Sequence, residues 1–358
     1  MKDFVYHHAS PRVVFGAGAL AHLEREIDLL RARRALVLST PEQAAQAQSV
    51  ADRLGARAAG VFPHAVMHVP IETARQAQDE ARRLGADCAV AIGGGSTIGL
   101  GKAIALDAGL PILAIPTTYA GSEMTPIYGI TEAGQKKTGR DARVRPRTVI
   151  YDPELTLTLP VPLSVTSGMN AIAHAAEGLY ARDGNPVMAL MAEEGVRALA
   201  QALPALTRRG DDLAARGDAL YGAWLCGTVL GSVGMALHHK LCHVLGGSFN
   251  LPHAEVHTVV LPQAIAFNAP AAPEAMARIQ RALGGATPRS AAAALFDLAR
   301  DNGAPVALRD IGMKADELER AADIVVANPY WNPRAVGVAE RDGILALLRR
   351  AFDGVRPD

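Results

Sequence analysis

The chain has 358 residues, a length that suits two domains of ordinary size. Its 36 Lys and Arg residues balance 36 Asp and Glu residues, and this zero net charge disfavours a nucleic-acid-binding protein, which usually carries a basic excess. Hydrophobic residues make up 49% and charged residues 20%, which is typical of a folded globular protein and not of a disordered one.

The first 150 residues alternate short apolar runs with helical stretches. We predict buried parallel strands in the apolar runs at 34–39, 88–92, 111–115 and 148–151. Such alternation is typical of βαβ units. Residues 1–160 are therefore expected to form an α/β domain with a Rossmann-like parallel sheet.

Two glycine motifs follow apolar runs. Residues 16–21 (GAGALA), after the run at 13–15, read as GxGxxA but lack an acidic residue about 20 positions on, so a tight turn is favoured there. The second motif, GGGST, contains Gly94, Gly95 and Ser96 and opens a helix. Glycines let the backbone approach an anion, and a helix N-terminus offers unpaired N–H groups. The second motif therefore predicts a pyrophosphate-binding turn.

A hydroxyl-rich segment, PTTYAGSE, follows the strand predicted at 111–115. Ligands of open α/β sheets bind at the carboxyl ends of the strands. We therefore expect Thr117, Thr118, Tyr119 and Ser122 to contact the cofactor.

After residue 160 the sequence favours helices almost throughout, so residues 161–358 are expected to form an all-α catalytic domain. We predict helices at 166–180, 187–203 and 212–245. Residues 219–237 carry no charge over 19 positions and contain GxxxG spacing, as a membrane span would. A buried helix is favoured, because small residues are frequent and histidines follow directly.

Histidines are concentrated in one short segment of this second half. Five of the 11 lie between 238 and 257: His238, His239, His243, His253 and His257. His239 and His243 share a helix face at i,i+4 spacing, and so do Asn170 and His174 on an earlier helix. Converging imidazoles suggest a metal site or acid–base chemistry. His238, turned to another face, and His257 are expected to serve packing.

The three cysteines, Cys88, Cys226 and Cys242, are odd in number and fit no zinc or redox spacing. The first ten residues contain no apolar run of the kind found in secretory signals. Both observations favour a protein of the reducing cytoplasm.

Taken together, the GGGS turn, the PTT…GSE loop, the N-x3-H pair and the H-x3-H-x9-H run resemble the iron-dependent alcohol dehydrogenase superfamily, whose members include glycerol dehydrogenase and dehydroquinate synthase. The resemblance spans nearly the whole chain and includes Asn332-Pro333-Arg334. It implies an α/β N-terminal domain (1–160) that binds a dinucleotide, followed by an all-α catalytic C-terminal domain (161–358), with the active site in the cleft between them.

One departure from the family concerns the metal. The family binds its metal with an Asp and three His, and the matching positions here are Asn170, His174, His239 and His253. A neutral amide is a much poorer ligand than a carboxylate for a divalent cation. We therefore expect no metal, with Asn170, His174 and His239 forming a vestigial metal site that faces the substrate.

The segments GGGSTIGLGKAI and PTTYAGSE are similar to the maleylacetate reductase branch, which reduces the carbon–carbon double bond of maleylacetate to 3-oxoadipate in aromatic degradation. His243 matches the superfamily's catalytic histidine and is the first candidate for proton donor, with His253 second. Lys240, Arg143 and Arg145 are candidates for binding the two substrate carboxylates, although each could equally be a solvated surface charge.

NAD-selective relatives carry an Asp after the second strand, where this chain has Ser39 and Thr40. Without that carboxylate nothing repels a 2′-phosphate, so both NADH and NADPH are expected to serve, with Ser39 among the cofactor contacts. Arg147 falls where relatives carry a lysine that contacts the ribose, and it completes the expected cofactor residues.

Three other functions stay open at this point. One is a metal-dependent alcohol dehydrogenase acting on a small alcohol or aldehyde, another a lyase or cyclase like dehydroquinate synthase, and the third a non-catalytic dinucleotide sensor. The expected partners are a small dicarboxylate and a second copy of the chain, since two-fold dimers are the commonest oligomers, with no nucleic acid and no membrane.

Overall fold

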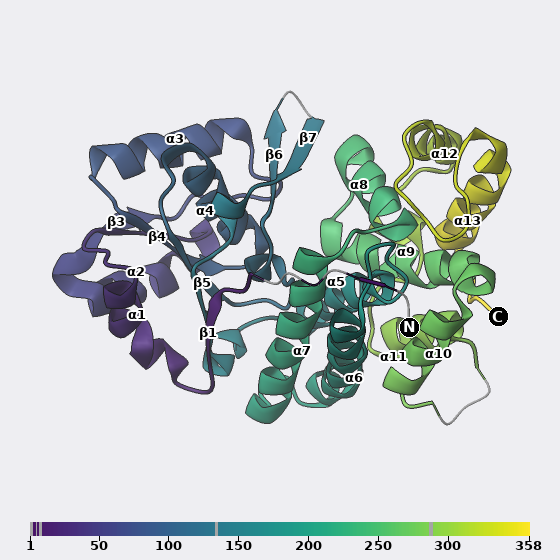
Figure 1. Ribbon diagram of the computed structural model, residues 1–358, viewed down its shortest axis with the longest axis horizontal. Coiled ribbons are helices and arrows are strands. Elements are labelled where there is room, and N and C mark those ends of the chain that lie inside the picture. Colours follow the sequence, from purple (N-terminus) through teal and green to yellow (C-terminus); the bar gives the residue numbers. More distant parts are fainter. Residues whose placement is uncertain (1–2, 5, 7–8, 133–134, 286–288) are drawn as a thin grey trace. The chain divides into compact units, whose positions relative to one another are not determined.

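The computed structural model describes residues 3–4, 6, 9–132, 135–285 and 289–358 (Figure 1). The chain divides into two compact units: one spans His8–Leu159, and the other spans Pro160–Asp358 together with the described residues before His8 (Asp3, Phe4 and Tyr6). The first carries the parallel sheet and the second consists of helices, which confirms the predicted fold class.

In the described part of the N-terminal unit, six parallel strands form one sheet in the order β1-β8-β5-β4-β2-β3. The strands are β1 (Arg12–Phe15), β2 (Ala35–Leu38), β3 (Ala58–Phe62), β4 (Cys88–Gly93), β5 (Ile112–Pro116) and β8 (Thr148–Tyr151). The main helices are α1 (Leu23–Leu29), α2 (Ala44–Leu54), α3 (Ile71–Arg83) and α4 (Gly95–Ala108). Both faces of the sheet are covered, because alternate residues of a strand enter different cores: Val37 packs with α1 and α2, and Leu36 with α3 and α4.

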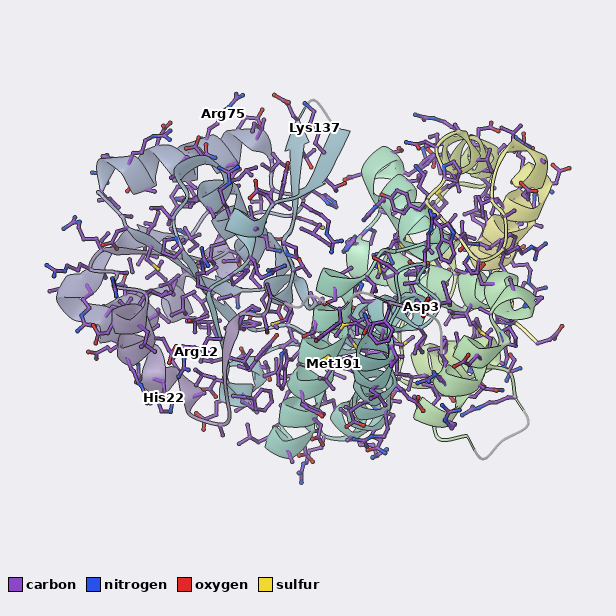
Figure 2. All side chains as sticks on the ribbon, viewed as in Figure 1. Asp3, Arg12, His22, Arg75, Lys137 and Met191 are labelled. Carbon is purple, nitrogen blue, oxygen red and sulfur yellow. The ribbon has the colours of Figure 1, made fainter. Side chains whose placement is uncertain are left out.

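Two further strands form an antiparallel hairpin, β6 (Ile127–Glu132) and β7 (Gln135–Arg140). Sequence analysis predicted neither this hairpin nor β3. The hairpin carries charge at its surface, where the Glu132 carboxylate meets Lys137 at 2.6 Å and Arg75 of α3 at 3.8 Å (Figure 2). A polar ribbon of this kind has no run of apolar residues to reveal it.

The C-terminal unit is built from helices that pack closely. They are α5 (Val161–Gly178), α6 (Pro186–Arg208), α7 (Leu213–Ser232), α8 (Leu237–Phe249), α9 (His253–Asn268), α10 (Pro273–Ala282), α11 (Ala291–Asp301), α12 (Leu318–Ala327) and α13 (Arg341–Asp353). Helix α5 packs against α6, α7 and α9 and is buried over most of its length. Glycine permits these contacts, since a Cβ at Gly178 would lie 2.2 Å from a methyl carbon of Val229.

The helix predicted at 212–245 is wrong in one respect: it is two helices, α7 and α8, which meet at 97°. Polar groups stabilise the break. The N–H of Gly234 donates to Asp183 at 2.8 Å, and the Glu177 carboxylate accepts the N–H groups of Ala236 and His238, both at 2.8 Å. These long-range contacts begin a new helix at Leu237, where apolar periodicity alone predicts continuation.

Helix α8 also continues past the predicted end at residue 245, through the two glycines at 246–247. It ends at Phe249, and the next residue, Asn250, adopts the left-handed conformation with φ of 53°. None of the helices in the described ranges is both long and apolar enough to cross a membrane alone; α7 and α8 meet that standard only as a pair, across their bend.

Candidate active site

The glycine turn of the N-terminal unit has the predicted strand–turn–helix form. Strand β4 ends at Gly93 and α4 begins at Gly95. A Cβ at Gly94 would lie 2.9 Å from a side-chain carbon of Thr118, so the turn packs tightly on the neighbouring loop. A Cβ at Gly95 would meet nothing within 4 Å. The first turn of α4, which also holds Ser96, thus leaves space for an anion beside its N–H groups.

The loop after β5 lies beside this turn. The N–H of Thr117 donates to the carbonyl of Gly93 at 3.1 Å, and Gln43 donates to the Thr117 hydroxyl at 2.9 Å. The structure therefore brings Gly94, Thr117 and Thr118 together at the carboxyl edge of the sheet. Sequence analysis did not predict the contribution of Gln43. This residue precedes an Ala/Gln-rich helix whose sequence gives no sign of a long-range contact.

A buried lysine holds the same loop from within. The Lys102 ammonium donates to the carbonyls of Ser122 and Ile127, each at 2.7 Å, and to the Thr125 hydroxyl at 2.9 Å. Burial lowers the pKa of Lys102 to about 7, while the charge of the buried Glu123 opposes that shift. Ser122 thus contributes its carbonyl to an internal network, which fixes the loop to α4.

Two tyrosines of this unit are also buried, and one of them, Tyr151, belongs to this network. The Tyr151 hydroxyl donates to Glu123 at 2.7 Å, and burial raises the pKa values of both groups. Tyr119, an expected cofactor contact, is completely buried, so its ring packs in the interior.

Two residues after β2, Ser39 and Glu42, bear on the expected contact with the adenosine ribose of the cofactor. Ser39 is buried, and its hydroxyl donates to the carbonyl of Thr40 at 2.9 Å. Glu42, which sequence analysis overlooked because it follows the strand end by several residues, is exposed. Its pKa is lowered by a backbone hydrogen bond and by the Thr40 hydroxyl, so a carboxylate is present close to this edge.

Arg147 is not brought to the carboxyl edge. It precedes β8, and its N–H donates to the carbonyl of Ile112 at the start of β5. In a parallel sheet this places Arg147 at the amino edge, about 13 Å of strand away from the glycine turn. The expectation of a ribose contact is corrected accordingly, because position in the sequence did not show on which side of the strand the residue falls.

Six imidazoles from three helices form a continuous cluster in the C-terminal unit. They come from α5 (His174), α8 (His238, His239, His243) and α9 (His253, His257). Ring centroids lie 5.0 Å apart for His174 and His239, 5.0 Å for His239 and His257, and 4.5 Å for His253 and His257. The structure thus gathers all the histidines that sequence analysis singled out.

Within the cluster, His174 and His239 are joined at 2.8 Å from Nδ1 to Nε2, and both rings are buried. Nδ1 of His239 lies 2.7 Å from the carboxylate of Glu177, which is completely buried. Asn170, one turn before His174, has a buried amide oxygen with no hydrogen-bond partner among the described residues. Sequence analysis missed Glu177, although its i,i+3 position after His174 places both on one helix face.

His243 has a different environment. Its Nδ1 lies 2.9 Å from the hydroxyl of Tyr330, and its ring is 6.2 Å from that of His239. The Lys240 ammonium lies over the Tyr330 ring, 5.6 Å from its centroid. Burial lowers the pKa of Lys240. Tyr330, which lies far away in sequence, therefore contacts both His243, the candidate for proton transfer, and the cationic Lys240.

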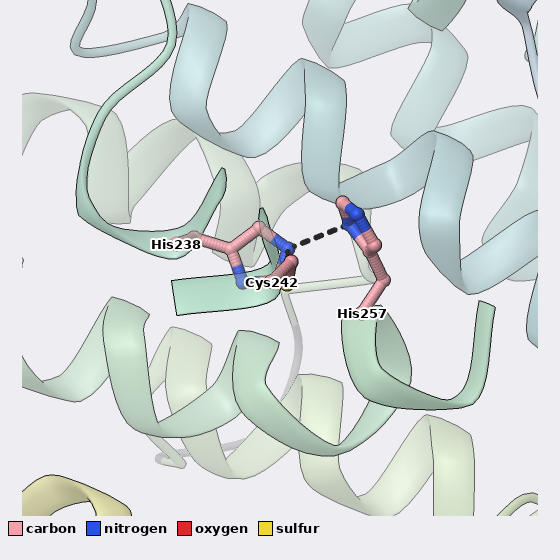
Figure 3. Close-up of side chains that lie close together, drawn as sticks. All are labelled: His238, Cys242 and His257. Atoms are coloured by element: carbon pink, nitrogen blue, oxygen red, sulfur yellow. Dashed lines mark hydrogen bonds between the residues drawn. The ribbon is translucent and has the colours of Figure 1, made fainter. Parts of the chain in front are cut away.

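A third group, His238, Cys242 and His257, has donor atoms that all lie within 4.8 Å of one another (Figure 3). Nε2 of His238 is 2.9 Å from Nδ1 of His257 and 3.5 Å from the Cys242 sulfur. Burial lowers the pKa values of both histidines, which favours the neutral form that binds metals. Burial raises the pKa of the thiol, so a bound cation would have to displace its proton.

Comparison with known families changes the conclusion about metal. Residues 10–153 match the model described as iron-containing alcohol dehydrogenase, and residues 164–352 match the C-terminal model of the Fe-containing alcohol dehydrogenase family. The expectation that no metal binds is therefore wrong. That expectation considered only that Asn170 stands where the family has an Asp. The unpartnered amide oxygen of Asn170, the imidazoles of the cluster and Cys242 still supply donors that fit a divalent cation.

Proteins named maleylacetate reductase match along the entire chain. The protein from Burkholderia cepacia is 67% identical over 357 residues, covering 100% of each chain, and that from Delftia acidovorans is 58% identical with 99% coverage of each. The crystal structure of the enzyme from Agrobacterium tumefaciens superposes with a TM-score of 0.94 at 55% identity and 100% coverage of each chain. By these matches, on top of the shared motifs and fold, the chain belongs to the iron-containing alcohol dehydrogenase family.

Proposed function

We propose that this chain reduces the carbon–carbon double bond of maleylacetate to 3-oxoadipate, with NADH or NADPH as the hydride donor. The observation that carries the proposal is the 67% identity to a maleylacetate reductase over the full length of both chains. The substrate is a small molecule with two carboxylates and an enone. The glycine turn with its adjoining loop supports the cofactor assignment, and the histidine cluster supports the chemistry.

The reaction needs a proton donor as well as a hydride. Hydride from the nicotinamide adds to the alkene carbon β to the ketone, negative charge develops on the ketone oxygen, and a proton reaches the adjacent carbon. We assign proton transfer to His243. Its Nδ1 is engaged by Tyr330 at 2.9 Å, so the ring is oriented and Nε2 is the nitrogen that we assign to the transfer. His253, at the start of α9, is the second candidate.

Lys240 is the candidate that best suits a substrate carboxylate. It lies one turn before His243 and contacts the same tyrosine. Partial burial strengthens its attraction for an anion, because less water screens the charge. Arg143, by contrast, is exposed and paired with Asp141 at 2.8 Å, and it belongs to the N-terminal unit, as does Arg145.

An iron ion would be held by donors of the histidine cluster. His238, Cys242 and His257 converge on one point, and the rings of His174 and His239 contact them. Asn170 lies one turn before His174 on α5. Such an ion supplies Lewis-acid polarisation of an oxygen when it is bound. The chain's own contribution is to keep the imidazoles neutral by burial and to orient them by hydrogen bonds.

We further place the protein in the reducing cytoplasm as a homodimer. All three cysteines are buried and unbridged, which suits a reducing compartment. Two-fold symmetry is the commonest arrangement of oligomers.

The test is to follow NADH oxidation by the purified chain with maleylacetate, and to identify the product by mass spectrometry. Parallel reactions supply short alcohols with NAD⁺ and short aldehydes with NADH, each before and after iron is added to a sample of measured metal content. We expect maleylacetate-dependent oxidation that yields 3-oxoadipate. Turnover of alcohols or aldehydes without turnover of maleylacetate would assign the chain to the alcohol dehydrogenases instead.

A further inference from the structure

The Glu177 carboxylate is completely buried near the end of α5 and is surrounded by donors. It accepts the N–H groups of Ala236 and His238, both at 2.8 Å, and that of His239 at 3.4 Å. Its shortest contact is to the Nδ1 atom of His239, at 2.7 Å. With this set of partners, both oxygens of the buried carboxyl group are hydrogen-bonded by oriented N–H groups at the start of α8.

These contacts determine which nitrogen of each imidazole carries hydrogen. Both oxygens of Glu177 already accept backbone N–H groups, so the carboxyl group acts as an acceptor toward the His239 ring as well, and the hydrogen of that ring is on Nδ1. Nε2 of His239 then has a lone pair, and it faces Nδ1 of His174 at 2.8 Å. His174 must donate in that contact, so its hydrogen is also on Nδ1 and its Nε2 is an acceptor.

We infer that Glu177 is a positioning residue, which sets the hydrogen-bonding direction of His239 and, through it, of His174 while it holds the start of α8. The inference rests on the proposed function for its catalytic consequence, since it gives these rings a defined donor pattern toward substrate or cation. A helix cap requires only the backbone donors. Glu177 makes an additional contact to the ring of His239, 62 positions away in the sequence. This contact links the position of α8 to the tautomer of the His239 imidazole.

The first test uses the unaltered protein. Selective ¹⁵N labelling of histidine and long-range ¹H–¹⁵N correlation spectra report the tautomer of each ring, and spectra of the variants His239→Gln and His174→Gln assign the two signals. At neutral pH we expect both rings to carry hydrogen on Nδ1. A ring of His239 that carries hydrogen on Nε2 alone would overturn the inference, whether or not the protein reduces maleylacetate.

The second test is a double-mutant cycle with maleylacetate reduction as the readout. Glu177→Gln keeps the size of the side chain but replaces an acceptor oxygen with a donor. We expect kcat to fall about 10–100-fold, the range found when a partner that orients a functional histidine is removed, with an unchanged Kd for NADH. In the His239→Gln background the same change should lower kcat less than about threefold, because the ring it acts through is gone.

Equal losses in both backgrounds would show that Glu177 serves only as a cap of α8, and would refute the positioning role. Glu319→Gln is the matched control, an exposed glutamate on α12 in the same unit, and should leave kcat unchanged. Far-ultraviolet circular dichroism checks that each variant folds; if Glu177→Gln does not, the tautomer measurement on the unaltered protein decides. Absence of maleylacetate turnover in the unaltered protein would count against the proposed function and not against the tautomers.

Discussion

The two units differ in the groups that make up their candidate functional residues. In the N-terminal unit the candidate cofactor-binding edge consists largely of backbone: a glycine turn, a strand end, and the contact from the Thr117 N–H to the Gly93 carbonyl. In the C-terminal unit the candidate groups are side chains carried by three helices. Backbone sites are specified by a short local sequence, whereas a side-chain cluster depends on how distant helices pack.

This difference leads to distinct expectations for substitutions. Changes at the glycine turn should alter cofactor affinity, and changes in the histidine cluster should alter the chemical step. Substitutions in each unit test that separation, beginning with the largest expected effect.

Substitution of His243 by alanine should have the largest effect on turnover. General acid catalysis contributes about 10²–10⁴-fold, so kcat should fall by that factor while the Kd for NADH barely changes. Stopped-flow hydride transfer and fluorescence titration of NADH measure the two quantities. His22→Ala, at an exposed position of the N-terminal unit (Figure 2), is the control. If kcat survives His243→Ala but not His253→Ala, the proton donor is His253.

Lys102→Met tests whether a buried side chain of the N-terminal unit stabilises the backbone of the loop after β5. The substitution removes the ammonium donor from four acceptor atoms: the carbonyl and hydroxyl of Ser122, the Thr125 hydroxyl and the carbonyl of Ile127. A buried acceptor left without any partner costs about 1–3 kcal/mol. Because the Ser122 carbonyl and the Thr125 hydroxyl keep other donors, we expect a net loss of about 2–4 kcal/mol in the free energy of unfolding. Urea titration measures it.

The same variant has a defined pH dependence. The pKa of Lys102 is lowered to about 7 in the folded protein, so between that pH and about 10.4 the unfolded chain binds more protons than the folded one. The stability of the unaltered protein therefore gains from Lys102 as pH rises through this window. The loss caused by Lys102→Met should be larger near pH 9.5 than near pH 7, and a smaller loss would contradict the assignment.

Gly95→Ala asks directly whether a ligand approaches the backbone. The protein leaves open space at this position, and alanine is favoured over glycine in a helix by about 0.5–1 kcal/mol, so thermal stability should be unchanged or slightly higher. The Kd for NADH should nevertheless rise about tenfold, equivalent to about 1.4 kcal/mol. Gly343→Ala, within α13, provides a helical control. An unchanged Kd would mean that the pyrophosphate binds elsewhere.

The smallest effect is expected at the end of β2. Thr40→Asp adds a carboxylate where NADH-selective relatives carry one, so the preference for NADH over NADPH should rise by up to about tenfold. Ratios of kcat/KM for the two cofactors provide the measurement. Glu42→Gln is its companion: a large gain in NADPH use would reveal that Glu42 already acts against the 2′-phosphate.

Local sequence was sufficient for much of this description. The strands of the sheet centre, the glycine turn and the i,i+4 pairing of His239 with His243 all follow from spacing and apolar pattern. Contacts between distant residues did not. Glu177 and Tyr330 reach the cluster from 62 and 87 positions away, and no local pattern signals such partners.

Sequence analysis also did not show at which edge of the sheet a residue lies. Arg147 lies beside a correctly predicted strand, yet at the wrong end of it for a cofactor contact. Similarly, the charge-free pattern of α7 continues into α8, while the break between them is stabilised by Asp183 and Glu177 from an earlier part of the chain.

The contact between Glu177 and the start of α8 has a consequence for the order of folding. It closes a segment of 59 residues, from Glu177 to Ala236, and closing such a loop costs about 4 kcal/mol of chain entropy. Its hydrogen bonds do not recover that cost until the α6–α7 hairpin within the loop has packed. We therefore expect the imidazoles to acquire their final orientation late in refolding, so that catalytic activity returns after helical circular dichroism has recovered.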